Sequence, residues 1–311
     1  MPLDPQAKAL LEKIEQSGAP AYNTLSAQEA RLLYDKASEL AQGSPPEPQA
    51  VTALKIPGPV SELDALMYKP EDSDKLPILV YFHGGGYTIG SLKSHDCVCR
   101  TLCVEAHCIV ISVDYRLAPE HKYPAAVDDS FTAAQWIANN ADSLGGDAER
   151  IAVGGDSAGG NLAAVVCIKA REAGAPQLVH QLLIYPGTDM SCSFPSHKTF
   201  GQNYRLTNEL IDWFYQHYFA PDSDIGHWLA SPLNADDLSQ LPPAFVLSAG
   251  FDPLQDEDKA YADKLEQAGV AVKYSHYEGM LHGFITMPGL FDKAREALSE
   301  CAAELRKAFA T

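Results

Sequence analysis

One stretch decides the fold prediction: Ile151-Ala152-Val153-Gly154-Gly155-Asp156-Ser157-Ala158-Gly159-Gly160-Asn161. An apolar strand runs into a glycine-rich turn that carries Ser157, and a helix follows at once. The pattern Gly-x-Ser-x-Gly between a strand and a helix is typical of a nucleophile elbow. Its glycines are needed because any Cβ so close to the serine would clash in the tight turn. The alternative interpretation is a plain packing turn between strand and helix.

Short strands and helices alternate on both sides of this turn. Strands are predicted at 65–68, 78–82, 109–114, 151–153, 181–185, 244–249 and 270–277. Helices are predicted at 94–106, 124–139, 158–172, 256–268 and 290–310. Several of the strands are apolar almost throughout, as is expected where helices cover both faces of a sheet. The alternation predicts an α/β fold with a doubly wound, mostly parallel sheet.

The first 42 residues lie outside the alternation and are predicted to be helical. Leu10, Leu11 and Ile14 share one face of a first helix. A second helix at 26–41 begins with a capping box. The proline-rich run at 43–48 then serves as a linker.

A second interruption lies between Tyr185 and Ala244, where no central strand is predicted. This segment contains a loop and a helix rich in aromatic residues. The helix is either an ordinary packed helix or a lid over the mouth of a pocket.

Composition excludes several classes of protein. The chain has 311 residues, is 46% hydrophobic and carries a formal net charge of -18. It is too apolar for a disordered chain, and its charge disfavours nucleic acids and anionic membranes while weakly favouring neutral or cationic ligands. No apolar run is long enough for a membrane helix, so no stable membrane association is expected. The N-terminus lacks the features of a signal peptide, which predicts a cytoplasmic location.

Four of the seven cysteines, Cys97, Cys99, Cys103 and Cys108, are clustered. Their spacing does not provide the paired Cys-x-x-Cys knuckles that zinc sites favour. We therefore expect no metal site, and we expect these thiols to pack as small hydrophobic side chains.

A run of three glycines follows the strand at 78–82. The loop His83-Gly84-Gly85-Gly86 exposes backbone N–H groups, which an oxyanion needs. Within this predicted oxyanion hole, the donors are expected to be Gly85, Gly86 and the Ala158 amide, while Gly84 and His83 shape the loop. A phosphate cradle is the competing interpretation, but the loop lacks the Lys-Ser/Thr of a P-loop.

A serine nucleophile needs a base and an acid that orients the base. His282 follows the last predicted strand and is the candidate base. Asp252 lies on the turn after the strand at 244–249 and is the candidate acid, with Asp256 as the second choice. The acidic residues that follow are better explained as first-turn carboxylates of the next helix. The chain order Ser157, Asp252, His282 is the order expected of α/β-hydrolases.

Taken together, five motifs resemble those of the bacterial hormone-sensitive-lipase-like esterases, often called family IV, of the α/β-hydrolase superfamily. They are His83–Gly86, Tyr115–His121, Gly155–Asn161, Asp252–Leu254 and His282–Phe284, in matching order and spacing. The resemblance implies an eight-stranded core at 46–187 and 226–311, with a helical cap formed by 1–45 and 188–225. It also implies carboxylesterase activity on short acyl chains without a metal or organic cofactor. One departure is Gln255, where the family often has an arginine.

These observations predict a serine carboxylesterase that acts on a small-molecule ester through an acyl-enzyme. Ser157 is the expected nucleophile, with His282 as base and Asp252 as its orienting acid. The alternatives are hydrolysis of an amide or formamide by the same triad, or a non-catalytic protein that binds a small molecule. The last strand of such a sheet is an exposed edge, and two copies can pair through such an edge to form a homodimer.

Overall fold

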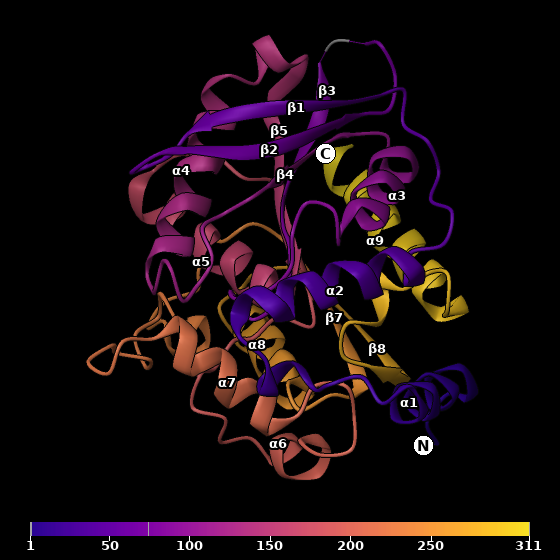
Figure 1. The fold of residues 1–311 in the computed structure, drawn as a ribbon. Coiled ribbons are helices and arrows are strands. Elements are labelled where there is room, and N and C mark those ends of the chain that lie inside the picture. Colours follow the sequence, from indigo (N-terminus) through magenta and orange to yellow (C-terminus); the bar gives the residue numbers. More distant parts are fainter. Residues whose placement is uncertain (1, 74, 311) are drawn as a thin grey trace.

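The computed structural model describes residues 2–73 and 75–310, and within them eight strands form one sheet in the order β1-β2-β4-β3-β5-β6-β7-β8 (Figure 1). Met1, Asp74 and Thr311 lie outside the described residues. The predicted ranges 1–45 and 226–311 therefore each have one end residue, Met1 and Thr311, outside them. The strands are β1 (Ala50–Pro57), β2 (Glu62–Lys69), β3 (Leu76–Phe82), β4 (Ile109–Val113), β5 (Gly146–Asp156), β6 (His180–Ile184), β7 (Ala244–Phe251) and β8 (Val272–Leu281). β1 and β2 are antiparallel to their neighbours, and all other pairs are parallel. The predicted mostly parallel sheet is confirmed.

Alternate side chains of the central strands enter two different cores. Ile78, Val80 and Phe82 of β3 pack on one face, while Leu79 and Tyr81 pack on the other. The first face is covered by α4 (Ala125–Asn139), α5 (Ala158–Ala173) and α8 (Gln255–Gln267), and the second by α3 (Asp96–Ala106) and α9 (Asp292–Phe309). Every residue of β3 and β4 is buried. This burial on both faces explains why these strands lack polar alternation.

The sequence prediction missed β1. Its pairing with β2 runs in register from Ala50 opposite Lys69 to Pro57 opposite Glu62. Only Ile56 is buried in this edge strand, so its sequence carries little hydrophobic signal. At the other edge, β8 continues to Leu281 instead of ending at 277. His282 therefore follows the strand directly, whereas the predicted strand ended at 277.

The N-terminal helices form largely as predicted. They are α1 (Pro5–Ser17) and α2 (Ala27–Ala41), and the capping box of α2 is present, because Ser26 and Glu29 exchange side-chain to backbone hydrogen bonds. The expected apolar face of α1 is incomplete, since Leu10 and Leu11 pack partly against the core while Ile14 is 47% exposed.

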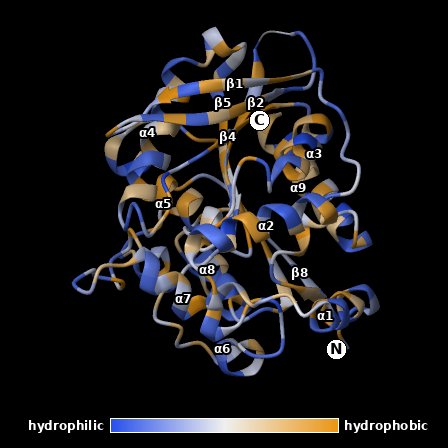
Figure 2. Cartoon of the chain, in the orientation of Figure 1, coloured by the Kyte–Doolittle hydropathy of each residue, from blue (hydrophilic) through white to orange (hydrophobic). Residues whose placement is uncertain are grey.

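The segment between β6 and β7 contains the predicted aromatic helix, α7 (Asn208–Tyr218), and also a short α6 (Pro195–Phe200) that was not predicted. Figure 1 shows α6 and α7 at the opposite end of the molecule from β1 and β2. In Figure 2, α2, α4 and α7 carry both hydrophilic and hydrophobic residues, as amphipathic helices do. Apolar residues of α2 and α7 meet in a third cluster, which includes Ala30, Tyr34, Ile211 and Phe214.

The clustered cysteines lie in the core. Cys97, Cys99 and Cys103 belong to α3, Cys108 precedes β4, and all are buried. Burial raises the pKa of the Cys97 and Cys103 thiols to about 12. In the described part of the chain, no group of three or more His, Cys, Asp or Glu side chains is placed to hold a metal ion. Nor does any helix among those residues have the length and apolar character to span a membrane.

A buried ion pair fixes the segment that leaves β4. Asp129 of α4 is fully buried and accepts hydrogen bonds from Arg116 through its backbone N (2.9 Å), Nε (2.8 Å) and Nη2 (2.7 Å). The neighbouring Tyr115 hydroxyl donates to the His83 carbonyl at 2.7 Å. The pair therefore holds the segment that supports the glycine loop.

Replacing Arg116 by glutamine leaves the Asp129 carboxylate buried without a cation. We expect the free energy of unfolding to fall by about 3 kcal/mol, because an unpaired buried charge is costly. Urea unfolding followed by circular dichroism measures the change. Lys8→Gln is the control, since it removes only an exposed pair with Glu12 at 3.8 Å and should leave the midpoint unchanged. Equal midpoints for the two variants would contradict the prediction.

Candidate active site

Ser157 occupies the turn between β5 and α5 in a strained backbone conformation, with φ 56° and ψ -120°. A Cβ on Gly155 would lie 2.4 Å from the Phe82 carbonyl oxygen, and one on Gly159 would lie 1.9 Å from the same atom. The turn therefore requires glycine at both positions, as predicted. It also places Ser157 at the carboxyl end of the sheet, where its amide donates to the Ile184 carbonyl at 2.9 Å.

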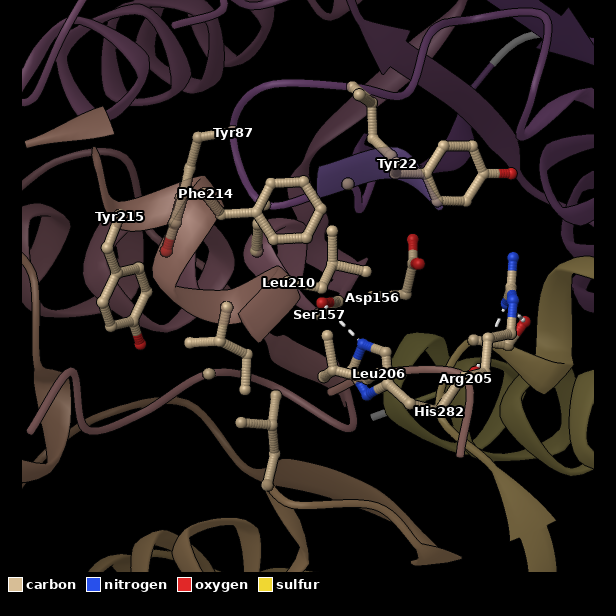
Figure 3. Close-up of a pocket in the computed structure, with 18 of the residues that line it drawn as sticks. Tyr22, Tyr87, Asp156, Ser157, Arg205, Leu206, Leu210, Phe214, Tyr215 and His282 are labelled. Atoms are coloured by element: carbon tan, nitrogen blue, oxygen red, sulfur yellow. Dashed lines mark hydrogen bonds between the residues drawn. The ribbon is translucent and has the colours of Figure 1, made fainter. Parts of the chain in front are cut away.

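The three residues predicted as nucleophile, base and acid form one hydrogen-bonded chain. Ser157 Oγ is 2.8 Å from His282 Nε2 (Figure 3), and His282 Nδ1 is 2.6 Å from Asp252 Oδ2. Asp252 is fully buried, and its other oxygen accepts from the Leu254 amide at 2.9 Å. The second-choice acid, Asp256, instead accepts from the Ser196 amide at 2.9 Å. The structure brings Asp252, and not Asp256, to the histidine.

Of the acidic residues after Asp252, Glu257 and Asp258 are fully buried in the first turn of α8. Glu257 accepts from the amides of Thr188 and Asp189 at 2.7 and 3.2 Å, and its other oxygen is 3.2 Å from His197 Nε2. Burial raises the pKa of Glu257 and, more strongly, that of Asp258. The sequence interpretation of these residues as helix-dipole carboxylates missed the role of Glu257, because its partners lie far away along the chain.

The amides of the glycine loop differ in whether they already have a partner. The Gly84 amide donates to Asp156 Oδ1 at 3.0 Å and is therefore not free for a ligand. Gly85 and Gly86 have φ angles of 120° and 57°, and they line the same cavity as Ser157 and Ala158. Among residues 2–73 and 75–310, no acceptor pairs with the amides of Gly85, Gly86 or Ala158. These three N–H groups are available for an oxyanion, while Gly84 shapes the loop.

The Asp156 carboxylate lies buried beneath this loop. It accepts from the Tyr81 hydroxyl at 2.8 Å and is 3.2 Å from His95 Nε2. Burial raises the pKa of Asp156, but the charge and hydrogen bonds of His95 and Tyr81 outweigh it, so the net shift is downward. Burial and the neighbouring His95 lower the pKa of His83 to about 3. Sequence reasoning did not single out Tyr81 or His95, because neither belongs to a motif with a chemical signature.

Ser157 lines a cavity whose two sides differ in polarity (Figure 3). Leu206, Leu210 and Phe214, from the segment between β6 and β7, form an apolar side. Tyr22 and Arg205 lie on the other side, and Arg205 is next to His282 (Figure 3). The cavity is thus enclosed by segments that lie outside the sheet.

Comparisons with known proteins agree with this geometry. A family model described as alpha/beta hydrolase fold matches residues 79–286. The chain is 45% identical to the carboxylic ester hydrolase LipN of Mycobacterium tuberculosis over 263 residues, which are 82% of this chain and 70% of that protein. It is 39% identical to an ethyl acetate hydrolase of Pseudomonas putida over 309 residues, 96% of each chain. The solved structure of the ester-hydrolase EH1AB1 from the metagenome of Lake Arreo matches with a TM-score of 0.97 at 44% identity, covering 99% of this chain and 100% of that one.

Replacing Asp156 by asparagine tests its role in holding the glycine loop. We expect the free energy of unfolding at pH 7 to fall by about 2–4 kcal/mol, because hydrogen bonds to a buried charge are lost. Since the pKa of Asp156 is lower in the folded state, its stabilisation is present above the unfolded pKa of about 4 and is lost as the pH falls through the folded value. The difference from wild type should therefore shrink below about pH 4.

Urea unfolding at pH 7, 4 and 3 measures this difference. Asp212→Asn is the matched control, since it removes the same charge from the exposed face of α7. A variant at Asp156 that is as stable as the Asp212 control at pH 7 would refute the assigned role.

Proposed function

The chain belongs to the hormone-sensitive-lipase-like (family IV) esterases of the α/β-hydrolase superfamily and is a carboxylic ester hydrolase, and we propose that it cleaves short-chain acyl esters through an acyl-enzyme on Ser157. The observation that carries the proposal is the hydrogen-bonded chain from Ser157 Oγ through His282 to the buried Asp252, with links of 2.8 and 2.6 Å. A serine hydroxyl is a weak nucleophile until a base within this distance removes its proton.

In the proposed first step, His282 Nε2 takes the hydroxyl proton as Ser157 Oγ attacks the ester carbonyl. Asp252 holds the histidine tautomer that leaves Nε2 free to accept, and it stabilises the imidazolium that forms. The carbonyl oxygen becomes an oxyanion. His282 then gives its proton to the leaving alcohol as the bond between carbonyl carbon and alcohol oxygen breaks. Water repeats the sequence on the acyl-enzyme and releases the carboxylic acid.

The oxyanion is bound by the amides of Gly85, Gly86 and Ala158. Support comes from the fact that all three line the cavity beside Ser157, whereas the Gly84 amide is already bonded to Asp156. Ala158 is also the first residue of α5, so the positive end of that helix dipole favours the developing charge. One donor of this kind typically contributes about 10²–10³ in rate.

We propose further that residues 1–45 and 188–225 form a cap over a core of residues 46–187 and 226–311. Two observations support this division. Apolar side chains of α2 and α7 pack together in a cluster that lies outside the two cores of the sheet. Arg31 of α2 donates to the carbonyls of Thr88 and Ala118 at 2.8 and 2.7 Å, which attaches the first segment to the loops of the core.

Short acyl chains are supported by the position of Phe214. Its ring lies so close to the glycine loop that a Cβ on Gly86 would be 2.2 Å from a ring atom. The aromatic ring therefore bounds the cavity near the expected carbonyl position. The substrate is a small-molecule ester. Pairing of two copies through the edge of β8 stays a prediction that light scattering can measure.

A series of p-nitrophenyl esters from acetyl to palmitoyl tests the proposed function. We expect hydrolysis to peak at short chains and Ser157→Ala to lower kcat by at least about 10⁴-fold, because the nucleophile is lost. Circular dichroism should show an unchanged fold. Ser143→Ala is the control, since that hydroxyl is exposed and bonds only to the nearby Asn140 carbonyl.

Two outcomes would overturn the proposal. Near-normal activity of the Ser157→Ala variant would remove Ser157 from the mechanism. A folded wild type that is inactive on all the esters but active on a matched anilide would instead identify an amide hydrolase.

A further inference from the structure

Arg205 is the one arginine or lysine among the described residues that line the cavity. It lies between α6 and α7 and is partly buried. Within the described chain, no Asp or Glu lies within ion-pair distance of its guanidinium. A partly buried cation without a carboxylate partner is unexpected in a chain with a formal net charge of -18. Solubility alone therefore does not explain why this partly buried position has an arginine.

The backbone after the catalytic histidine is shaped to receive this arginine. Arg205 Nη1 donates to the carbonyls of His282 and Gly283, at 3.3 and 3.1 Å. Gly283 has a φ of 77°, and a Cβ there would lie 2.2 Å from Nη1. The guanidinium is thus held in a fixed place beside His282, as Figure 3 shows.

Two phenols accompany the guanidinium on this side of the cavity. Burial raises the pKa of Tyr34 to about 12, while Arg205 acts in the opposite direction through its charge and a hydrogen bond. Burial also raises the pKa of Tyr22, and the charge of Arg205 again opposes it. Both hydroxyl groups therefore stay protonated at neutral pH and can donate hydrogen bonds. Together with the guanidinium they form a set of donors.

Asp156 also lines the cavity, but its carboxylate is buried and forms no ion pair with Arg205. Its oxygens are bonded to Tyr81 and Gly84 and approach His95. The donor set around Arg205 thus remains open to a ligand. A planar guanidinium flanked by hydroxyl donors matches the geometry and charge of a carboxylate.

We propose that Arg205, with Tyr22 and Tyr34, forms a carboxylate-binding subsite, and that the preferred substrates are O-acyl esters of hydroxycarboxylic acids. This inference rests on the proposed function, because it names the substrate class of that site. The net charge predicts a weak preference for neutral or cationic ligands. The proposed subsite instead gives a local preference for an anion.

The carboxylate belongs to the alcohol half of the ester. His282 gives its proton to the leaving alcohol, so the alcohol lies on the side of the histidine. Arg205 contacts the backbone of His282 and Gly283 on that same side. The apolar residues Leu210 and Phe214 line the opposite side and suit an acyl chain.

The test compares 4-acetoxybenzoate with its methyl ester, which share the acetyl group and the aryl leaving group but differ in charge. The measured quantity is the ratio of kcat/KM for the anionic substrate to that for the neutral one. Arg205→Gln should lower this ratio about tenfold to hundredfold, because a charge-assisted hydrogen bond is lost. Arg205→Lys keeps the charge and should give a smaller loss. Lys198→Gln is the matched control, since it removes one charge from the exposed face of α6, and it should leave the ratio unchanged.

Equal losses on both substrates in Arg205→Gln would show that the arginine only positions the histidine loop, and they would overturn the proposal. A second pair, mono-p-nitrophenyl succinate against p-nitrophenyl butyrate, carries the charge on the acyl side, and its ratio should not depend on Arg205. A ratio that changes only in this second pair would overturn the assignment to the alcohol half.

Binding of the product 4-hydroxybenzoate gives a readout that does not depend on turnover. Calorimetry should detect it with wild type and with Ser157→Ala, and should show at least tenfold weaker binding with Arg205→Gln. Equal binding by wild type and Arg205→Gln would overturn the subsite even if the esterase mechanism holds. Failure of the esterase mechanism would instead appear as neutral-ester hydrolysis that does not depend on Ser157.

Discussion

The buried carboxylate of Asp156 connects the parts of the site that lie far apart in the sequence. It directly precedes Ser157 and accepts hydrogen bonds from Tyr81 in β3 and from the Gly84 amide in the glycine loop. His95, at the start of α3, lies within 3.2 Å. A charge in the interior is tolerated only when its lone pairs are satisfied, so these donors must stay in place. The elbow and the loop are thereby held as one rigid unit.

Sheet topology places that unit beside the histidine and its acid. β3 and β5 are parallel neighbours, with Phe82 opposite Gly155, so the glycine loop and the elbow leave the sheet side by side. β7 and β8 are likewise parallel neighbours, and Asp252 and His282 directly follow them. In a parallel sheet all these strand ends share one edge, which is where ligands bind. The reacting groups therefore lie on rigid elements, and this preorganises them.

Segments outside the sheet determine what can enter the site. The α7 segment supplies an apolar wall that includes Phe214, and the N-terminal segment supplies Tyr22 and Tyr34. Arg205 lies between these parts and is bonded to the backbone that follows β8. Chemistry and selectivity are thus carried by different parts of the chain. A change in either outer segment can alter the substrate range while the sheet and its strand ends are kept.

The sequence by itself determined the features that are encoded locally. Apolar strands, amphipathic helices, the capping box at Ser26 and the glycines around Ser157 each follow from neighbouring residues, and they predicted a mostly parallel α/β sheet. The positions of Asp252 and His282 after the last two predicted strands, together with their chain order, selected them, with Asp256 as the second choice for the acid. The sequence did not reveal β1. Its only buried residue is Ile56, and its strand conformation depends on backbone pairing with β2. The partners of Asp156 and Glu257, and the position of Arg205 beside His282, were decided only by the tertiary structure, because hydrogen bonds between residues distant along the chain leave no local pattern.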